Sequence, residues 1–143
     1  MTKAPASGEP RAGAAIAHIG IALRDLGDGL VFFRDILGLP DAPVPLDDAD
    51  GARIVGLVAG HSLVELLEAT SADSPIGKFI AKRGPGIHHV CFAVSDLEGT
   101  LDRCRRAGVR LIDESPRVGA EGRRIAFVHP ASTGGVLVEL TER

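Results

Sequence analysis

The chain has 143 residues, of which 45% are hydrophobic and 24% are charged, and its formal net charge is −3. This length and composition predict one soluble globular domain, and no apolar run approaches the ~18 residues that a membrane-spanning helix needs. The weak negative charge and the lack of Trp and Tyr argue against binding to nucleic acid or to a membrane surface. Cys91 and Cys104 lack the spacing of a disulfide framework, which indicates free thiols in a reducing cytoplasm, where we expect the protein to act.

The first fifteen residues are rich in Ala, Gly and Pro and lack the apolar core of a signal peptide, so residues 1–15 are expected to form a disordered tail. A single domain is expected over 16–143. Its first unit, about 16–69, alternates apolar residues as strands do and includes a helical stretch that ends at Gly38. We expect a strand, a helix and two strands, at 16–23, 27–37, 52–59 and 62–68. The proline-rich segment between the helix and the second strand reads as a loop or an irregular edge strand.

A linker of about 70–86 follows, and Ser74-Pro75 predicts a short helix within it because proline suits the first helical position. The second unit, about 87–143, repeats the plan of the first. It is expected to contain a strand, a helix and three further strands, at 88–94, 97–107, 109–113, 124–129 and 136–141.

The two units are related by an offset of 71 residues, which takes His18 to His89 and Asp25 to Asp96. In each first strand, alternation puts the histidine and the small residues that follow it on one face and the aliphatic residues on the other. The small residues leave room in front of each histidine. Two copies of one βαβββ unit therefore predict an α+β fold built from tandem modules.

Four residues would share one concave surface if the two units pair about a pseudo-two-fold axis: His18, Glu65, His89 and Glu139. Each of the two glutamates stands between aliphatic residues of a strand, and burying a carboxylate without a cation is costly. One such residue alone is more often exposed or hydrogen-bonded, but four in register favour a shared site. Two imidazoles and two carboxylates suit a divalent ion such as Co²⁺, Mn²⁺, Ni²⁺, Fe²⁺ or Zn²⁺, with two positions left open for catalysis.

Other polar residues have weaker claims. His88 alternates with His89, so we expect it to point the other way and to have a supporting role. His129 is expected to cap a turn, and His61 to be exposed at a hairpin. A basic patch on the linker helix suits phosphate groups, although solvated surface charge is an equally good interpretation; it consists of Lys78, Lys82 and Arg83. The glycine-rich loop 119–122 lacks the context of a phosphate-cradling motif.

Three segments carry a resemblance to a known family: HIGIALRDL (18–26), ELLEATSADSPIGKFIAKRGPGIHHVCFAVSDL (65–97) and ESPRVGAEGRRIAFVHPASTGGVLVEL (114–140). They cover about half of the chain. The chain resembles the vicinal oxygen chelate superfamily (glyoxalases, bleomycin resistance proteins and dioxygenases), in which two βαβββ modules form an open β-cup around a metal ion. Within that superfamily the two longer segments resemble the methylmalonyl-CoA epimerase family.

This resemblance implies a metal-dependent epimerisation at C2 of methylmalonyl-CoA, in which a proton is removed and returned through a metal-stabilised enolate. Carried over position by position, it implies that His18, Glu65, His89 and Glu139 bind the metal, with Co²⁺ as the first choice and Mn²⁺, Ni²⁺ or Zn²⁺ next. Inversion needs an acid–base group, or a water in its place, on each side of the enolate plane. We expect Glu139 and Glu65 to flank that plane because they come from opposite modules. The implied partners are an acyl-CoA substrate and a second copy of the chain in a homodimer, with no nucleic acid and no membrane.

Two positions depart from the family pattern. Some members have Gln where this chain has Glu65, and a second carboxylate should hold the metal more firmly while weakening its Lewis acidity. Some members have a glutamate, proposed as a proton-transfer base, where the nearest residue here is Ile54. The alternatives are a lactoylglutathione lyase, an extradiol dioxygenase, a metal-free ligand-binding protein of the same fold, and an epimerase of another acyl-CoA. The absence of Tyr argues against the dioxygenase, and the complete ligand set argues against the binding protein.

Overall fold

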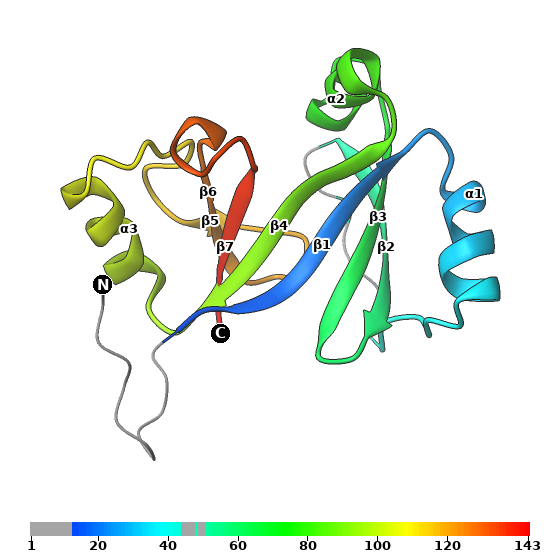
Figure 1. The fold of residues 1–143 in the computed structure, drawn as a ribbon, viewed down its shortest axis with the longest axis horizontal. Helices are drawn as coiled ribbons and strands as arrows, with labels where there is room; N and C mark the ends of the chain where they lie inside the picture. Colours follow the sequence, from blue (N-terminus) through cyan, green and yellow to red (C-terminus); the bar gives the residue numbers. More distant parts are fainter. Residues whose placement is uncertain (1–12, 44–47, 49–50) are drawn as a thin grey trace.

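The computed structural model describes residues 13–43, 48 and 51–143. These residues form one mixed sheet with the strand order β2-β3-β1-β4-β7-β6-β5, which curls into a half-barrel (Figure 1). Within the described ranges, no helix is long and apolar enough to cross a membrane. The expected disordered tail lies mostly outside the described residues, and its last residue, Ala15, already belongs to the first strand.

The first module follows the predicted order of elements. It contains β1 (Ala15–Leu23), α1 (Leu26–Leu30), a π-helix (Val31–Ile36), β2 (Ala52–Ala59) and β3 (Ser62–Ala69). β1 pairs with β3 in parallel, which requires the intervening helical crossover, and β2 forms an antiparallel hairpin with β3. The Asp25 carboxylate starts α1 by accepting a hydrogen bond from the Gly27 N–H at 2.7 Å.

The helix of this first module differs from the single helix expected over 27–37. After Leu30 it winds as a π-helix, and the Leu37 N–H donates to the Phe32 carbonyl at 2.8 Å. Several apolar side chains of this segment lie outside the core. Four of them are exposed: Val31, Phe32, Ile36 and Leu37.

The linker contains α2 (Pro75–Arg83), whose N-cap Ser74 accepts a hydrogen bond from the Gly77 N–H at 3.1 Å, as the Ser-Pro pair predicts. The second module contains β4 (Gly86–Val94), α3 (Leu97–Arg106), β5 (Arg117–Val118), β6 (Arg124–Val128), a short 3₁₀ helix (Pro130–Ser132) and β7 (Val138–Glu142). β4 pairs with β7 in parallel, just as β1 pairs with β3. This repetition confirms the predicted tandem modules, and among the described residues the remaining strand of the first module is reduced to an isolated bridge between Asp41 and Leu57.

The strand expected at 109–113 is wrong. Only Leu111 forms an isolated bridge, with Val128, and the added strand is β5 instead. The cause is Asp113, whose carboxylate accepts a hydrogen bond from the Phe127 N–H at 2.8 Å. A ladder that continued along 109–113 would need that donor, so the side chain ends the pairing.

The two modules meet where β1 and β4 run antiparallel at the centre of the sheet (Figure 1). Each module has its own core: Ala22, Ala52 and Leu67 in the first, together with Ile76 of the linker helix α2, and Val94, Leu97, Leu101, Ala126, Val128 and Leu140 in the second. The register of the central pair sets His18 opposite Cys91 and Gly20 opposite His89. The two predicted histidines therefore come to one place on the concave side of the sheet.

Candidate metal centre and active site

The central strand pair brings the two histidines into contact. His18 Nε2 lies 2.9 Å from His89 Nε2, and both side chains are buried. Gly20 makes this approach possible, because a Cβ atom there would lie 2.2 Å from the His89 ring. The predicted space beside the small residues of β1 is therefore present, and the His89 ring of the other module occupies it.

Glu139 completes a cluster of three donor atoms. Its strand, β7, pairs with β4, which places Glu139 Oε1 3.4 Å from His89 Nε2 and 3.6 Å from His18 Nε2. The ligand atoms of these three residues all lie within 4.8 Å of one another. Cys91 donates a hydrogen bond of 3.4 Å to Glu139 Oε2 and so helps to orient the carboxylate.

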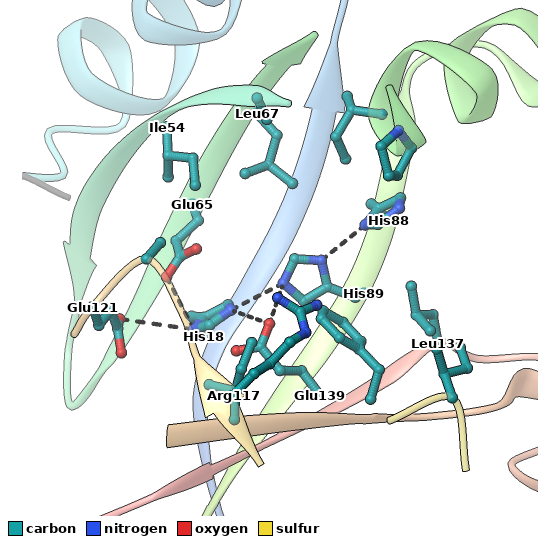
Figure 2. Close-up of a pocket in the computed structure, with 17 residues that line it drawn as sticks. His18, Ile54, Glu65, Leu67, His88, His89, Arg117, Glu121, Leu137 and Glu139 are labelled. Atoms are coloured by element: carbon teal, nitrogen blue, oxygen red, sulfur yellow. Dashed lines mark hydrogen bonds and ion pairs between the residues drawn. The ribbon is translucent and has the colours of Figure 1, made fainter. Parts of the chain in front are cut away.

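Glu65 lies at the other nitrogen of the His18 ring (Figure 2). Its Oε2 is 3.0 Å from His18 Nδ1, and Glu121 Oε1 is 3.8 Å from the same nitrogen. His18, Glu65 and Glu121 form a second group with ligand atoms within 4.8 Å. All four predicted ligands therefore line one site: His89 and Glu139 lie at Nε2 of His18, and Glu65 lies at its Nδ1.

The chemistry of these atoms fits a bound cation. Among the described residues, His18 Nδ1 and Glu65 Oε2 are buried atoms that make no hydrogen bond, although they lie close together. Buried polar atoms are normally satisfied, and uncompensated carboxylates in an apolar setting are costly. Imidazole nitrogens beside carboxylate oxygens are the donors that borderline divalent metals prefer.

The two histidines carry different charges. Burial alone would lower the pKa of His18, but its contacts with Cys91, Glu139 and Glu65 raise that pKa to about 12. Burial lowers the pKa of His89 to about 3, and the positive charge of His18 adds to this effect against the attraction of Glu139. A protonated His18 therefore donates to a neutral His89, and this proton occupies the place that suits a metal ion.

The carboxyl groups also differ from one another. Burial would raise the pKa of Glu139, but hydrogen bonding to His18 and the charge of His18 hold it below its usual value. Burial and the neighbouring charge of Glu65 raise the pKa of Glu121. Burial raises the pKa of the Cys91 thiol to about 12, so this thiol stays neutral beside Glu139.

His88 supports His89 rather than pointing away from it. The two Nδ1 atoms lie 2.9 Å apart, and the His88 ring packs edge-on against Phe79 of α2. Because His89 accepts at Nε2 from His18, its Nδ1–H donates to His88, which fixes the tautomer with Nε2 directed at the site. The expected supporting role agrees with this geometry, whereas the expected orientation was wrong.

A cavity of about 230 Å³ lies over this cluster. Its walls are mostly apolar and include Ile54, Leu67, Ile76, Ile125, Phe127 and Leu137. The Arg117 guanidinium packs over the Phe127 ring at 5.5 Å and brings a positive charge to the rim. A second groove of about 400 Å³ adjoins the cavity through His88, His89 and Leu137, and the predicted basic patch lines it: Lys78, Lys82 and Arg83.

Sequence reasoning missed two polar residues of the cavity, Glu121 and Arg117. Glu121 lies in the glycine-rich loop 119–122 and Arg117 lies just before it, in a segment with no periodicity. The only signal in the sequence was the carboxylate of Glu121, which stands between small residues. Two minor predictions are confirmed. His129 Nδ1 accepts a hydrogen bond of 3.0 Å from the Ala131 N–H and caps the 3₁₀ turn, and His61 is exposed.

Comparison with known proteins gives consistent matches. Residues 17–127 match the Glyoxalase/Bleomycin resistance protein/Dioxygenase superfamily. The mitochondrial methylmalonyl-CoA epimerase of Bos taurus is 34% identical over 148 residues, which cover 99% of this chain and 84% of that protein. A solved methylmalonyl-CoA epimerase in complex with methylmalonyl-CoA and NH₄⁺ has a TM-score of 0.84 at 36% identity, covering 90% of this chain and 94% of that one. A variant of the Streptomyces coelicolor methylmalonyl-CoA epimerase, in complex with 2-nitronate-propionyl-CoA, has a TM-score of 0.83 at 37% identity. The match covers 90% of this chain and 93% of that one.

Proposed function

The chain belongs to the glyoxalase/bleomycin resistance protein/dioxygenase superfamily, and from this relationship and its site we propose that it is a metal-dependent epimerase acting at C2 of methylmalonyl-CoA. Its named relatives are methylmalonyl-CoA epimerases, so the chain is an isomerase. Solved relatives hold CoA esters, which supports an acyl-CoA substrate here. A nitronate is planar and anionic, as C2 of the substrate must become when it loses its proton.

The proposed metal ligands are His18, Glu65, His89 and Glu139. The observation that carries the proposal is the convergence of His18 Nε2, His89 Nε2 and Glu139 Oε1 within 4.8 Å at the base of an apolar cavity. A divalent ion bound there, with Co²⁺ as first choice, would stabilise negative charge on the thioester oxygen. The apolar walls exclude water and strengthen that effect.

The chain's own carboxylates would move the proton. Glu139 is buried yet faces the cavity, and the low pKa that His18 gives it keeps it in the basic form. It would take the C2 proton from one face of the substrate. Glu65, the residue that the sequence analysis expects at the other face, is held at His18 Nδ1.

The adjoining groove suits the CoA part of the substrate. It shares Pro75, His88, His89 and Leu137 with the cavity, so an acyl group over the metal cluster could extend its thioester arm into this groove beside α2. The cationic side chains there would meet phosphate groups: Lys78, Lys82 and Arg83. Charge reversal of Lys82 should therefore raise KM and leave kcat nearly unchanged.

The homodimer is also proposed. Four apolar side chains of the first module are exposed next to one another on the π-helix and its end, and Ile36 is 71% exposed. Contiguous apolar surface of this kind marks interaction sites. Light scattering with size-exclusion chromatography should give twice the chain mass, and Phe32→Lys should give the single-chain mass.

The test of the proposed function is deuterium incorporation at C2 of methylmalonyl-CoA in D₂O, followed by mass spectrometry with a chiral assay of the product. Metal-stripped protein should be inactive, and added Co²⁺ should restore both exchange and inversion. Metal content and the visible absorption of bound Co²⁺ report the site independently of turnover. Metal-loaded protein that binds Co²⁺ but exchanges no C2 proton would contradict the reaction and favour the lyase or the ligand-binding alternative.

A further inference from the structure

Inversion at C2 needs an acid–base group on each face of the substrate, and Glu139 and Glu65, the two expected bases, are not equally accessible to a substrate. A proton must leave one face of a planar carbon and another must arrive on the opposite face, so an acid–base group is needed on each side. Among the described residues that line the cavity, three carry carboxyl groups: Glu65, Glu121 and Glu139.

Glu65 is the least able of the three to reach a substrate. Only 4% of its side chain is exposed, and its Oε2 lies 3.0 Å from His18 Nδ1 without a hydrogen bond. A carboxylate in that position compensates a cation, whether a protonated His18 or a metal ion. Glu65 is also less accessible from the cavity than Glu139 and Glu121, whose side chains are 10% and 22% exposed.

Glu121 lies nearer the opening. Its side chain is 22% exposed, and it stands on the turn between β5 and β6 rather than on a buried strand. It lines the same cavity as the metal cluster. A ligand that enters the cavity can therefore meet this carboxyl group directly.

The positions of Glu121 and Glu139 are complementary. Glu121 Oε1 lies 3.8 Å from His18 Nδ1, and Glu139 Oε1 lies 3.6 Å from His18 Nε2. The two nitrogens point in different directions from one ring, so the two carboxyl groups flank His18 (Figure 2). The remaining wall on the side of the first module is apolar, with Ile54 and Leu67. A carbon atom held over His18 would have one carboxyl group on either side.

We propose that Glu121 is a catalytic acid–base residue that exchanges the C2 proton on the face opposite Glu139. The proposal rests on the proposed epimerase function. In one direction the Glu139 carboxylate takes the C2 hydrogen as a proton, and the C–H electron pair enters the enolate. The Glu121 carboxylic acid then gives its proton to C2 on the other face, where the enolate pair forms the new C–H bond. Glu121 ends as a carboxylate and Glu139 as an acid, and solvent protons restore both.

The test uses Glu121→Gln in D₂O with each C2 epimer supplied separately and with bound metal measured. We expect interconversion to fall about 10²- to 10⁴-fold at unchanged metal content. One epimer, whose proton faces Glu139, should still exchange deuterium at C2 with its configuration retained, and the other should lose exchange together with inversion. Retained exchange of one epimer also shows that the variant is folded. Glu114→Gln is the control, because Glu114 is exposed, accepts a hydrogen bond from Arg105 and should leave every rate unchanged.

The outcomes separate this inference from the function on which it rests. If the wild-type protein does not interconvert the epimers, the proposed function fails and this role fails with it. If the wild type is active and Glu121→Gln matches it, the function stands and the role of Glu121 is overturned. Loss of metal in the variant, or loss of exchange for both epimers, would equally overturn a role confined to one face.

Discussion

His18 and His89 hold the same place in the two modules, yet their surroundings differ. His18 lies between Glu65 and Glu139, one at each ring nitrogen, and its pKa rises to about 12. His89 meets one carboxylate and two other imidazoles, and its pKa falls to about 3. Duplication of a strand therefore reproduces the position of a side chain, whereas the charge of that side chain depends on which strands become its neighbours.

The outer layers of the two modules differ in the same way. α1 and α3 lie at opposite ends of the sheet (Figure 1). α3 buries Leu97 and Leu101 in a core, but the π-helix that follows α1 turns its apolar side chains outward. The helix that follows the first strand therefore packs into a core in the second module. In the first module its apolar side chains remain exposed and can contact a second copy of the chain.

The largest expected effect separates the two buried carboxylates. Glu139→Gln should lower the interconversion rate about 10²- to 10⁴-fold, because it removes a base as well as a metal ligand. Glu65→Gln should mainly weaken metal binding, so saturating Co²⁺ should restore most of its rate. Steady-state rates at rising Co²⁺ concentration measure both. If both variants lost the same fraction of the interconversion rate at saturating Co²⁺, the two carboxylates would have the same catalytic role.

The second prediction compares the outer helices. Leu101→Ala removes a fully buried side chain of α3 and should lower the free energy of unfolding by about 2–5 kcal/mol. Phe32→Ala on the π-helix should change the stability of the single-chain form by no more than about 0.5 kcal/mol. Urea unfolding of both variants at low protein concentration tests this. A comparable loss for Phe32→Ala would mean that this helix packs as α3 does.

The third prediction concerns the residues that face the histidines across the central strand pair. Gly20→Ala puts a methyl group 2.2 Å from the His89 ring, so it should cost about 1–3 kcal/mol of stability and displace that ring from the metal cluster. Cys91→Ala, the corresponding change in the other module, should leave His18 in place. Metal affinity by competition with a chelating dye is the measurement. A Gly20→Ala variant with wild-type metal affinity would contradict the close approach.

The fourth prediction concerns the pH dependence of metal binding. His18 stays protonated below about pH 12 and His89 stays neutral above about pH 3, so binding one metal ion should release one proton, from His18 alone. Metal affinity should therefore rise about tenfold per pH unit between about pH 7 and 9. Calorimetry in buffers of different ionisation enthalpy counts the protons. No release in this range would show that both histidines titrate near their ordinary values.

Local patterns in the sequence were sufficient to predict the central strands, the helix starts and the pairing of the two modules. Alternating residues placed β1 and β4 correctly, and Asp25 and Asp96, which the offset relates, are the N-caps of α1 and α3. The offset between the modules identified His18 and His89 as partners, which now lie in contact. These features succeed because strand alternation and helix capping depend on residues close together in the chain.

Features that depend on distant residues could not be found in this way. The strand at 109–113 fails because the Asp113 side chain takes a donor from Phe127, and Glu121 enters the site from a segment without any period. The opposite charges of His18 and His89 likewise arise only once β3, β7 and the central pair converge. The sequence by itself determined two modules and their metal-binding residues as a hypothesis. The tertiary structure alone decided which carboxylate meets which nitrogen, because those contacts depend on how the strands pair across the sheet.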